Sequence, residues 1–231
     1  MEGGNVRKFA VIIPSLLSLS FGGHSSQSYV IDTPSLKYFK ASDYSQSSSC
    51  LIVNMPNLEE ADISLSRSPD VKKLLEPFTY VKRLSLNLFY NNAEVVYGDD
   101  IVFNGLEHLK FRIGDTKWSK SLLWLLKSSP KLREFEFEVY QGDTSVCWKE
   151  LVYVPQCLLS SLETFMWACN NPTTEERDLA TYILRNSCRL RTARFWIGSW
   201  LDPQKKLEMK NELVLSSRGS TMCNLVFDNF D

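Results

Sequence analysis

The chain has few of the patterns that mark metal-binding, nucleic-acid-binding and membrane proteins. Its formal net charge is −1, with 26 basic and 27 acidic residues among 231, which gives no electrostatic attraction to nucleic acid or to an anionic membrane. The six cysteines include no Cys-x-x-Cys pair, so neither a zinc ribbon nor a compact disulfide framework is expected. We expect buried, reduced thiols, which favour the cytoplasm or the nucleus. No apolar run reaches the roughly 18–20 residues of a membrane span.

Patterns of catalysis are equally scarce. The two histidines, His24 and His108, have no sequence neighbours that suggest a catalytic triad or a metal site. The glycine pairs near the N-terminus are not followed by the Gly-Lys-Ser/Thr of a phosphate-binding loop. The sequence therefore predicts a protein that is not an enzyme and holds no cofactor or metal. An enzyme acting on a small molecule would instead need a deep pocket lined by clustered polar residues.

An apolar spacing, Leu-x-x-Leu-x-Leu, recurs in degenerate form. One clear copy is Leu106-x-x-Leu109-x-Phe111. The eight copies begin at Leu16, Leu36, Leu58, Val81, Leu106, Leu132, Leu162 and Leu190. Most of the steps between them fall in the window of about 20–29 residues that is typical of leucine-rich repeats. A stacked-repeat architecture favours a binding surface over a catalytic site.

Several copies follow a proline, as in Thr33-Pro34-Ser35-Leu36. The proline predicts a turn, and the apolar spacing after it predicts a short strand. The three apolar positions then face the interior, while the residues between them face outward along a concave sheet. We expect an α/β leucine-rich-repeat solenoid with parallel strands, and with short helices or loops on its convex side. Trp118–Ser128 is predicted to be one such helix, because it is apolar almost all round.

The apolar run Phe9–Phe21 follows Arg7 and Lys8, as in a secretory signal. Pro14 interrupts this run, and Ile13-Pro14-Ser15-Leu16 repeats the turn phrase of the later copies. We interpret the run as the first repeat, with a secretory signal as the alternative.

The pattern changes near residue 150. Thr173 and Glu176 form the capping box of a helix that continues to Asn186. Asp202 and Pro203 supply the N-cap and first residue of a second helix, and residues 223–227 predict a closing strand. We therefore divide the chain into leucine-rich repeats at 1–149 and a C-terminal α+β cap at 150–231 that includes the last repeats.

The residues of this C-terminal part resemble the FBD domain of plant proteins. Its opening is similar to Val154–Trp167, its two helices to Thr181–Asn186 and Lys206–Leu213, and its ending to Arg218–Ser220 with Cys223–Asp228. Upstream, Asn54–Ala61 and Val81–Leu86 resemble the repeats that precede FBD in plant F-box/LRR proteins. The resemblance covers nearly the whole chain.

This resemblance implies the substrate-recognition part of a cullin–RING ubiquitin ligase, whose repeats hold a target protein. In that family an N-terminal F-box binds a Skp-type adaptor. No F-box precedes the repeats in this sequence, so adaptor and cullin are expected only as indirect partners. The alternative is a truncated or vestigial relative that acts as a stand-alone interaction or structural protein. The target remains unknown, and the expected location is the cytoplasm, the nucleus or both.

The predicted outward strand positions define a candidate protein-binding face. A basic set, His108, Lys110 and Arg112, should lie beside an acidic set, Glu134, Glu136 and Glu138, with Arg194 and Trp196 further along. One interpretation is a charged platform that orients a target. The other, which we favour, is a cross-strand charge ladder whose exposed pairs each contribute about 0–1 kcal/mol.

Tryptophans and tyrosines divide into predicted core residues and predicted contact residues. Trp196, Trp200 and Tyr140 are candidates for exposed anchors, because aromatic side chains often dominate binding energy. Trp118, Trp124 and Trp167 lie on apolar faces and are expected in the core, while Trp148 fits either role.

Overall fold

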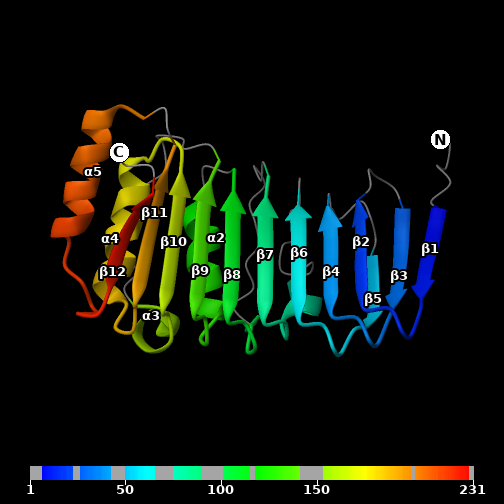
Figure 1. The fold of residues 1–231 in the computed structure, drawn as a ribbon. Coiled ribbons are helices and arrows are strands. Elements are labelled where there is room, and N and C mark those ends of the chain that lie inside the picture. The colour runs from blue at the N-terminus through cyan, green and yellow to red at the C-terminus, as the bar shows by residue number, and fades with distance from the viewer. Residues whose placement is uncertain are drawn as a thin grey trace.

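The computed structural model describes residues 7–22, 27–42, 50–65, 75–89, 101–114, 118–140, 153–198 and 201–228. In this part the chain forms an α/β fold of two layers, with a long parallel sheet on one side (Figure 1). Trp148 and Trp200 lie outside the described ranges. No helix of the described part is long and apolar enough to cross a membrane.

The long sheet has nine strands, and every pair is parallel. Each strand pairs with the strand of the next repeat, so spatial order follows chain order (Figure 1). The strands are β2 (Ser18–Gly22), β4 (Tyr38–Ser42), β6 (Glu60–Leu65), β7 (Arg83–Leu88), β8 (His108–Ile113), β9 (Glu134–Val139), β10 (Thr164–Cys169), β11 (Thr192–Ile197) and β12 (Asn224–Asp228).

Alternating burial along these strands explains why the repeats stack. In β8, Leu109 and Phe111 are buried, while His108 and Lys110, which alternate with them along the strand, are half-buried. Successive side chains of a strand point to opposite faces, so the repeated apolar spacing directs one face of every strand into the core. One repeat cannot cover its own apolar face, and its neighbours cover it instead.

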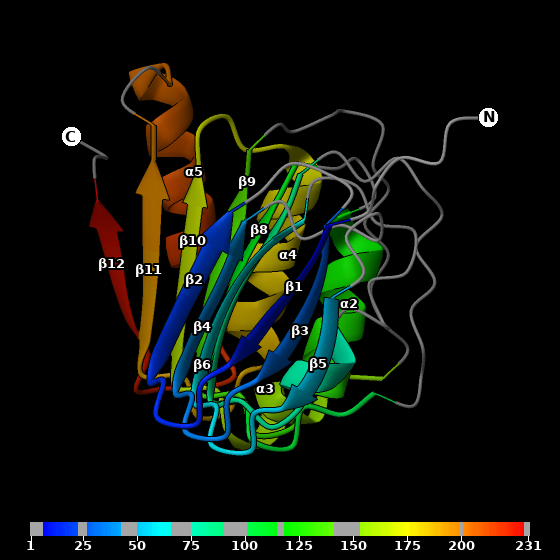
Figure 2. The same cartoon turned by 90° about the vertical axis from the view of Figure 1, so that its right-hand side faces the viewer.

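The second layer begins as a sheet, which differs from the short helices and loops expected on that side. Its three parallel strands are β1 (Arg7–Ile12), β3 (Gln27–Asp32) and β5 (Cys50–Asn54). Figure 2 shows them on the opposite side of the molecule from β2, β4 and β6. Short runs rich in β-branched residues, such as Tyr29–Ile31 and Leu51–Val53, precede the proline turns. Such runs favour strands over helices.

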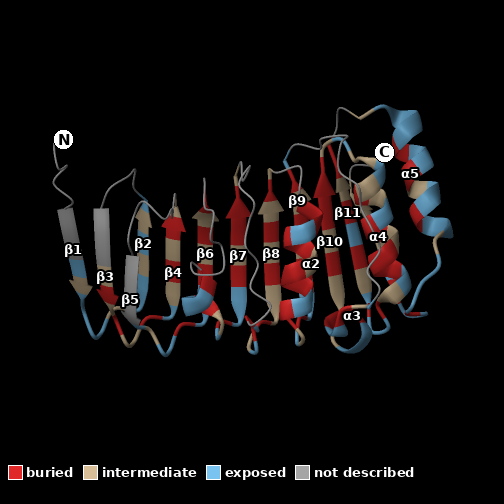
Figure 3. Ribbon diagram, turned by 180° about the vertical axis from the view of Figure 1, so that it is seen from behind, coloured by how far each residue is buried: buried red, intermediate tan, exposed pale blue. Residues whose placement is uncertain are grey.

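Helices replace strands in this layer from the fourth repeat onward (Figure 3). Their bounds are η1 (Glu76–Phe78), α2 (Trp118–Ser128), α3 (Gln156–Ser160), α4 (Thr174–Asn186) and α5 (Pro203–Leu215). The helix predicted for Trp118–Ser128 is confirmed with the same bounds. The Thr173 hydroxyl accepts from the backbone N–H of Glu176, and Asp202 caps α5 with Pro203 as its first residue, as predicted.

Aromatic side chains form much of the core between the layers. Rings of consecutive repeats lie in contact, with Phe135 and Phe165 stacked at 5.7 Å between centroids. Trp118 and Trp167 are almost completely buried, and Trp124 is 7% exposed, so the three predicted core tryptophans are confirmed. The sheet runs without a break from β9 to β10, across the expected boundary near residue 150. The division into 1–149 and 150–231 stays a prediction.

Candidate functional site

The outward residues of neighbouring strands lie in three straight rows across the long sheet. The first row joins Glu60, Arg83, His108, Glu134 and Thr164. The second row joins Asp62, Ser85, Lys110, Glu136, Met166 and Arg194. The third joins Ser64, Asn87, Arg112, Glu138, Ala168 and Trp196. All eight residues of the predicted site therefore lie on this one face.

The basic set on β8 is in register with the acidic set on β9. Lys110 Nζ forms an ion pair with Glu136 Oε1, and Arg112 Nε donates to Glu138 Oε2 at 2.9 Å. At the start of the strands, His108 Nδ1 lies 2.7 Å from Glu134 Oε2, in an approach that lacks hydrogen-bond geometry.

These cross-strand pairs satisfy opposite charges within the protein. Lys110, Glu136, Arg112 and Glu138 are each between about a quarter and a third exposed at the side chain. Partly exposed pairs of this kind contribute about 0–1 kcal/mol each, because water screens them and ordering the side chains costs entropy. The geometry agrees with a charge ladder that fixes these side chains in place and leaves little net charge to attract a ligand.

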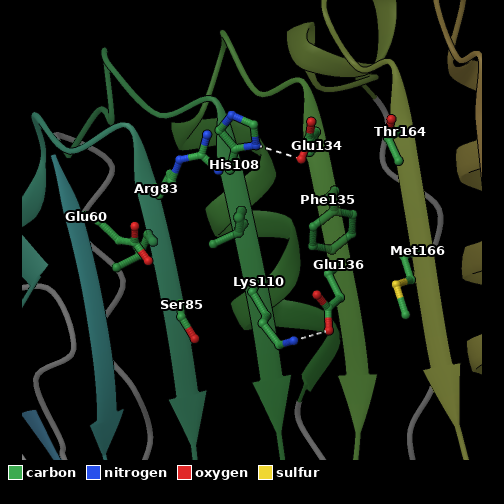
Figure 4. Close-up of a pocket in the computed structure, with 12 residues that line it drawn as sticks. Glu60, Arg83, Ser85, His108, Lys110, Glu134, Phe135, Glu136, Thr164 and Met166 are labelled. Carbon is green, nitrogen blue, oxygen red and sulfur yellow. Dashed lines mark ion pairs between the residues drawn. The ribbon is translucent and has the colours of Figure 1, made fainter. Parts of the chain in front are cut away.

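A shallow depression of about 290 Å³ lies in the middle of this face. Figure 4 shows the side chains that line it on neighbouring strands of the sheet. It is lined by Glu60, Arg83, Leu84, Ser85, His108, Leu109, Lys110, Glu134, Phe135, Glu136, Thr164 and Met166. Four residues of the predicted site, His108, Lys110, Glu134 and Glu136, thus belong to it.

Side-chain size explains where the depression forms. Ser85 is a short side chain between Asp62 and Lys110 in the second row. Met166 lies beyond the Lys110–Glu136 ion pair in the same row, and its apolar side chain lines the depression (Figure 4). The sequence placed Ser85 and Met166 on the outward face, but the predicted site omitted them because the charged neighbours dominated the pattern.

The remaining predicted residues lie outside the depression. Arg112 and Glu138 occupy the third row, and Arg194 Nη1 lies 3.4 Å from Asp228 on the last strand. Trp196 is half-buried on β11. Tyr140, a predicted anchor, is 37% exposed and stacks on Phe89 at 5.5 Å. Burial raises the pKa of its hydroxyl.

The described acid–base and thiol groups outside this face lie apart from one another or are held in their protonated form by burial. In the described part, no group of three or more His, Cys, Asp or Glu side chains could hold a metal ion. Burial raises the pKa of the Cys157 thiol to about 12, and burial also raises that of Cys169. Such thiols stay protonated, and only the thiolate is a strong nucleophile. Cys223 is buried as expected, but Cys188 is exposed, so the prediction of buried thiols was wrong at that position.

Comparison with known proteins identifies relatives of the whole chain. The FBD family profile matches residues 149–195. An FBD-associated F-box protein of Arabidopsis thaliana is 57% identical over 224 residues, which cover 92% of this chain and 44% of the relative. The chain contains an FBD domain and is a homologue of plant F-box/FBD/LRR proteins.

Other relatives from Arabidopsis thaliana support the same assignment. An F-box/FBD/LRR-repeat protein is 52% identical over 237 residues, covering 97% of this chain and 52% of the relative. A further FBD-associated F-box protein is 42% identical over 232 residues, covering 96% of the chain and 53% of the relative. The chain therefore spans about half the length of these relatives. No solved structure matches it.

Proposed function

We propose that this chain is a non-enzymatic protein-binding module. The two layers form a leucine-rich-repeat solenoid, and the outward face of the nine-stranded sheet recognises a target protein. The observation that carries this proposal is the depression on that face, which collects residues from five consecutive repeats. A binding surface made from several repeats is what stacked-repeat proteins commonly provide.

The face is suited to recognition because its polar side chains are already ordered. Lys110 and Glu136 hold each other beside the hollow, so a target does not have to immobilise these long side chains when it binds. Binding then draws on shape and on apolar contact. Met166 supplies that contact, because its flexible thioether side chain adapts to different partners. The expected target places an apolar side chain against Met166, with polar groups at the rim.

Arg83 adds a positive charge to this surface that is available to a ligand. It is exposed, and it has no ion-pair partner among the described residues, unlike the basic residues on β8. Guanidinium groups bind carboxylates through two parallel hydrogen bonds. We expect an acidic side chain of the target near Arg83.

A role in ubiquitin ligation extends the proposal to partners outside this chain. The relatives are named as F-box proteins, and family resemblance links that name to a Skp-type adaptor and a cullin. In this proposal the sheet supplies the target-binding part, and the adaptor contact lies outside the face described above. The cytoplasm or the nucleus remains the proposed location, on the ground that the cysteines are expected to be reduced thiols.

The test compares proteins captured by the chain and by matched variants in plant cells. Ser85→Arg combined with Met166→Asp fills the depression and places a charge on its apolar wall. Lys120→Asp changes the exposed surface of α2, on the other layer. We expect the first variant to lose specific partners that the parent and Lys120→Asp both retain, as measured by quantitative mass spectrometry.

The captured proteins test target recognition by the outward face separately from the role in ubiquitin ligation. If the three proteins capture the same partners while remaining folded by circular dichroism, the outward face does not recognise the target. Recovery of a Skp-type adaptor and a cullin with both the parent and the filled variant supports the ligase role. Their absence from every sample, with target binding intact, makes the chain a stand-alone binder.

A further inference from the structure

Opposite charges that lie side by side on the outward face of the long sheet usually form ion pairs. Lys40 Nζ lies 2.8 Å from Asp62 Oδ2 on the next strand, and two further pairs join β8 to β9. Glu60 on β6 and Arg83 on β7 are also in register. Both side chains are exposed, and neither has an ion-pair partner among the residues that the structure describes. These two opposite charges are therefore neighbours that remain unpaired.

The direction of the Arg83 side chain explains why the two charges do not pair. Figure 4 shows its guanidinium group turned away from β6 and toward His108 on β8, while the Glu60 carboxyl group stays on the β6 side of the depression. The two carboxylates that β9 contributes to the depression each lie against a basic side chain of β8. The depression therefore keeps one acid, Glu60, and one base, Arg83, that a ligand can reach.

A partner that covers the depression has to satisfy both of these charges. A charge that is removed from water without an opposite charge beside it costs free energy. A wholly acidic segment would pair with Arg83 but meet Glu60 as a like charge, and a wholly basic segment would do the reverse. A segment with one residue of each sign avoids both penalties, and its carboxylate can bind the guanidinium group of Arg83 through two parallel hydrogen bonds.

The order of the strands determines the order of these contacts. Glu60, Arg83 and Met166 belong to β6, β7 and β10, which follow one another in this order across the sheet. Neighbouring strands lie about 4.8 Å apart, so Met166 lies about 14 Å beyond Arg83. The face thus presents an acid, a base and an apolar side chain along one direction. The complementary partner presents a basic, an acidic and an apolar side chain in the same order.

We propose that the depression binds a polypeptide segment in which an acidic residue stands between a basic residue and an apolar one. This rests on the proposed function, because it specifies the target that the outward face recognises. An extended segment advances about 3.3 Å per residue, which puts its acidic residue about one to three positions from the basic one and about four from the apolar one. A polypeptide fits better than a small molecule, because small-ligand pockets enclose most of the ligand surface and this depression is shallow.

The first test selects binders for the purified chain from a phage-displayed library of random linear peptides. We expect the selected peptides to share the basic–acidic–apolar order, and to lose binding when Ser85→Arg and Met166→Asp together fill the depression. Selection on Arg83→Glu should replace the acidic residue of the pattern by a basic one. Selection on Glu60→Lys should replace the basic residue by an acidic one.

A second test measures the affinity of a synthetic peptide with the selected pattern by isothermal titration calorimetry. Arg83→Glu should weaken its binding about tenfold or more, because an attraction becomes a repulsion. A peptide whose acidic residue is changed to lysine should recover affinity for Arg83→Glu and bind the parent chain weakly. Lys127→Glu is the matched control, since it makes the same charge change at an exposed position of α2 in the other layer, and it should bind as the parent does. Circular dichroism verifies that the variants are folded.

Peptides that require the open depression but share no charge pattern would overturn this inference and leave target recognition by the outward face intact. The same conclusion holds if Arg83→Glu and Glu60→Lys select the same peptides as the parent. A library that yields no peptide dependent on the depression would overturn the inference as well, while the capture of partners in plant cells still tests the proposed function separately.

Discussion

Glu176 provides the sharpest quantitative test of the structure. Its side chain is 2% exposed at the start of α4, where Thr173 Oγ1 lies 3.3 Å from Glu176 Oε1. The second carboxyl oxygen, Oε2, has no hydrogen-bond partner in the described part, and the nearby Trp167 Nε1 lacks hydrogen-bond geometry toward it. Burial raises the pKa of this carboxyl from 4.5 to about 7, and its contacts with Thr173 and Trp167 only partly offset the effect.

The raised pKa determines both the sign and the size of the change in folding stability with pH. A folded state that holds the protonated carboxyl more tightly is most stable below pH 4.5, and it loses stability as the pH rises toward about 7. At about 1.4 kcal/mol for each factor of ten in proton affinity, the change from 4.5 to about 7 corresponds to about 3 kcal/mol. Glu176→Gln removes the ionisation while keeping the shape of the side chain. It should therefore be more stable than the parent above neutral pH.

Urea unfolding of the parent and Glu176→Gln at a series of pH values measures this difference. We expect the two proteins to converge near pH 4.5 and to differ by about 3 kcal/mol above pH 7. Glu175→Gln is the control, because it removes a charge from the same helical turn at a half-buried position. This control should keep most of the pH dependence of the parent, because the Glu175 charge is the smallest of the causes that shift the pKa of Glu176. A constant difference between Glu176→Gln and the parent at all pH values would refute the reasoning.

Three further predictions address the face, the turns and the core. A double-mutant cycle of Lys110→Ala and Glu136→Ala should give a coupling below about 1 kcal/mol, and a larger value would contradict the charge-ladder interpretation. Gly105→Ala places a Cβ 2.8 Å from the Tyr80 carbonyl oxygen, so the free energy of unfolding in urea should fall by about 1–3 kcal/mol. An unchanged free energy of unfolding would mean that the turns of Gly105 and Tyr80 are less closely packed than in the structure. Phe135→Ala removes a ring that is 1% exposed, and the loss should be about 3–5 kcal/mol, whereas a loss under about 1 kcal/mol would contradict its place in the core.

The strand positions of the long sheet could be predicted from the sequence because each depends on local information. The spacing of Leu106, Leu109 and Phe111 specifies which side chains of β8 face inward. Neighbouring repeats share that spacing, which fixes their register as well and sets Lys110 beside Glu136. Helix caps such as Thr173 were also predictable, because the cap interaction joins residues three apart in the chain.

Other features depend on packing between distant residues, and the sequence did not predict them. The runs that form β3 and β5 are too short to show whether that layer holds strands or helices. The depression arises because Ser85 is shorter than its neighbours on adjacent strands, which only the paired sheet reveals. Glu176 was expected to cap α4, and that role does not predict that the packed core covers its carboxyl group.

Site-specific photo-crosslinking would show directly whether the outward face of the nine-stranded sheet binds a target protein. A photoreactive amino acid replaces Met166 in the depression or, in the control, Lys120 on α2. Each protein is expressed and irradiated in plant cells. We expect discrete covalent adducts with a target from position 166 and none from position 120. Adducts from position 120 alone, or the same adducts from both, would contradict target binding by this face.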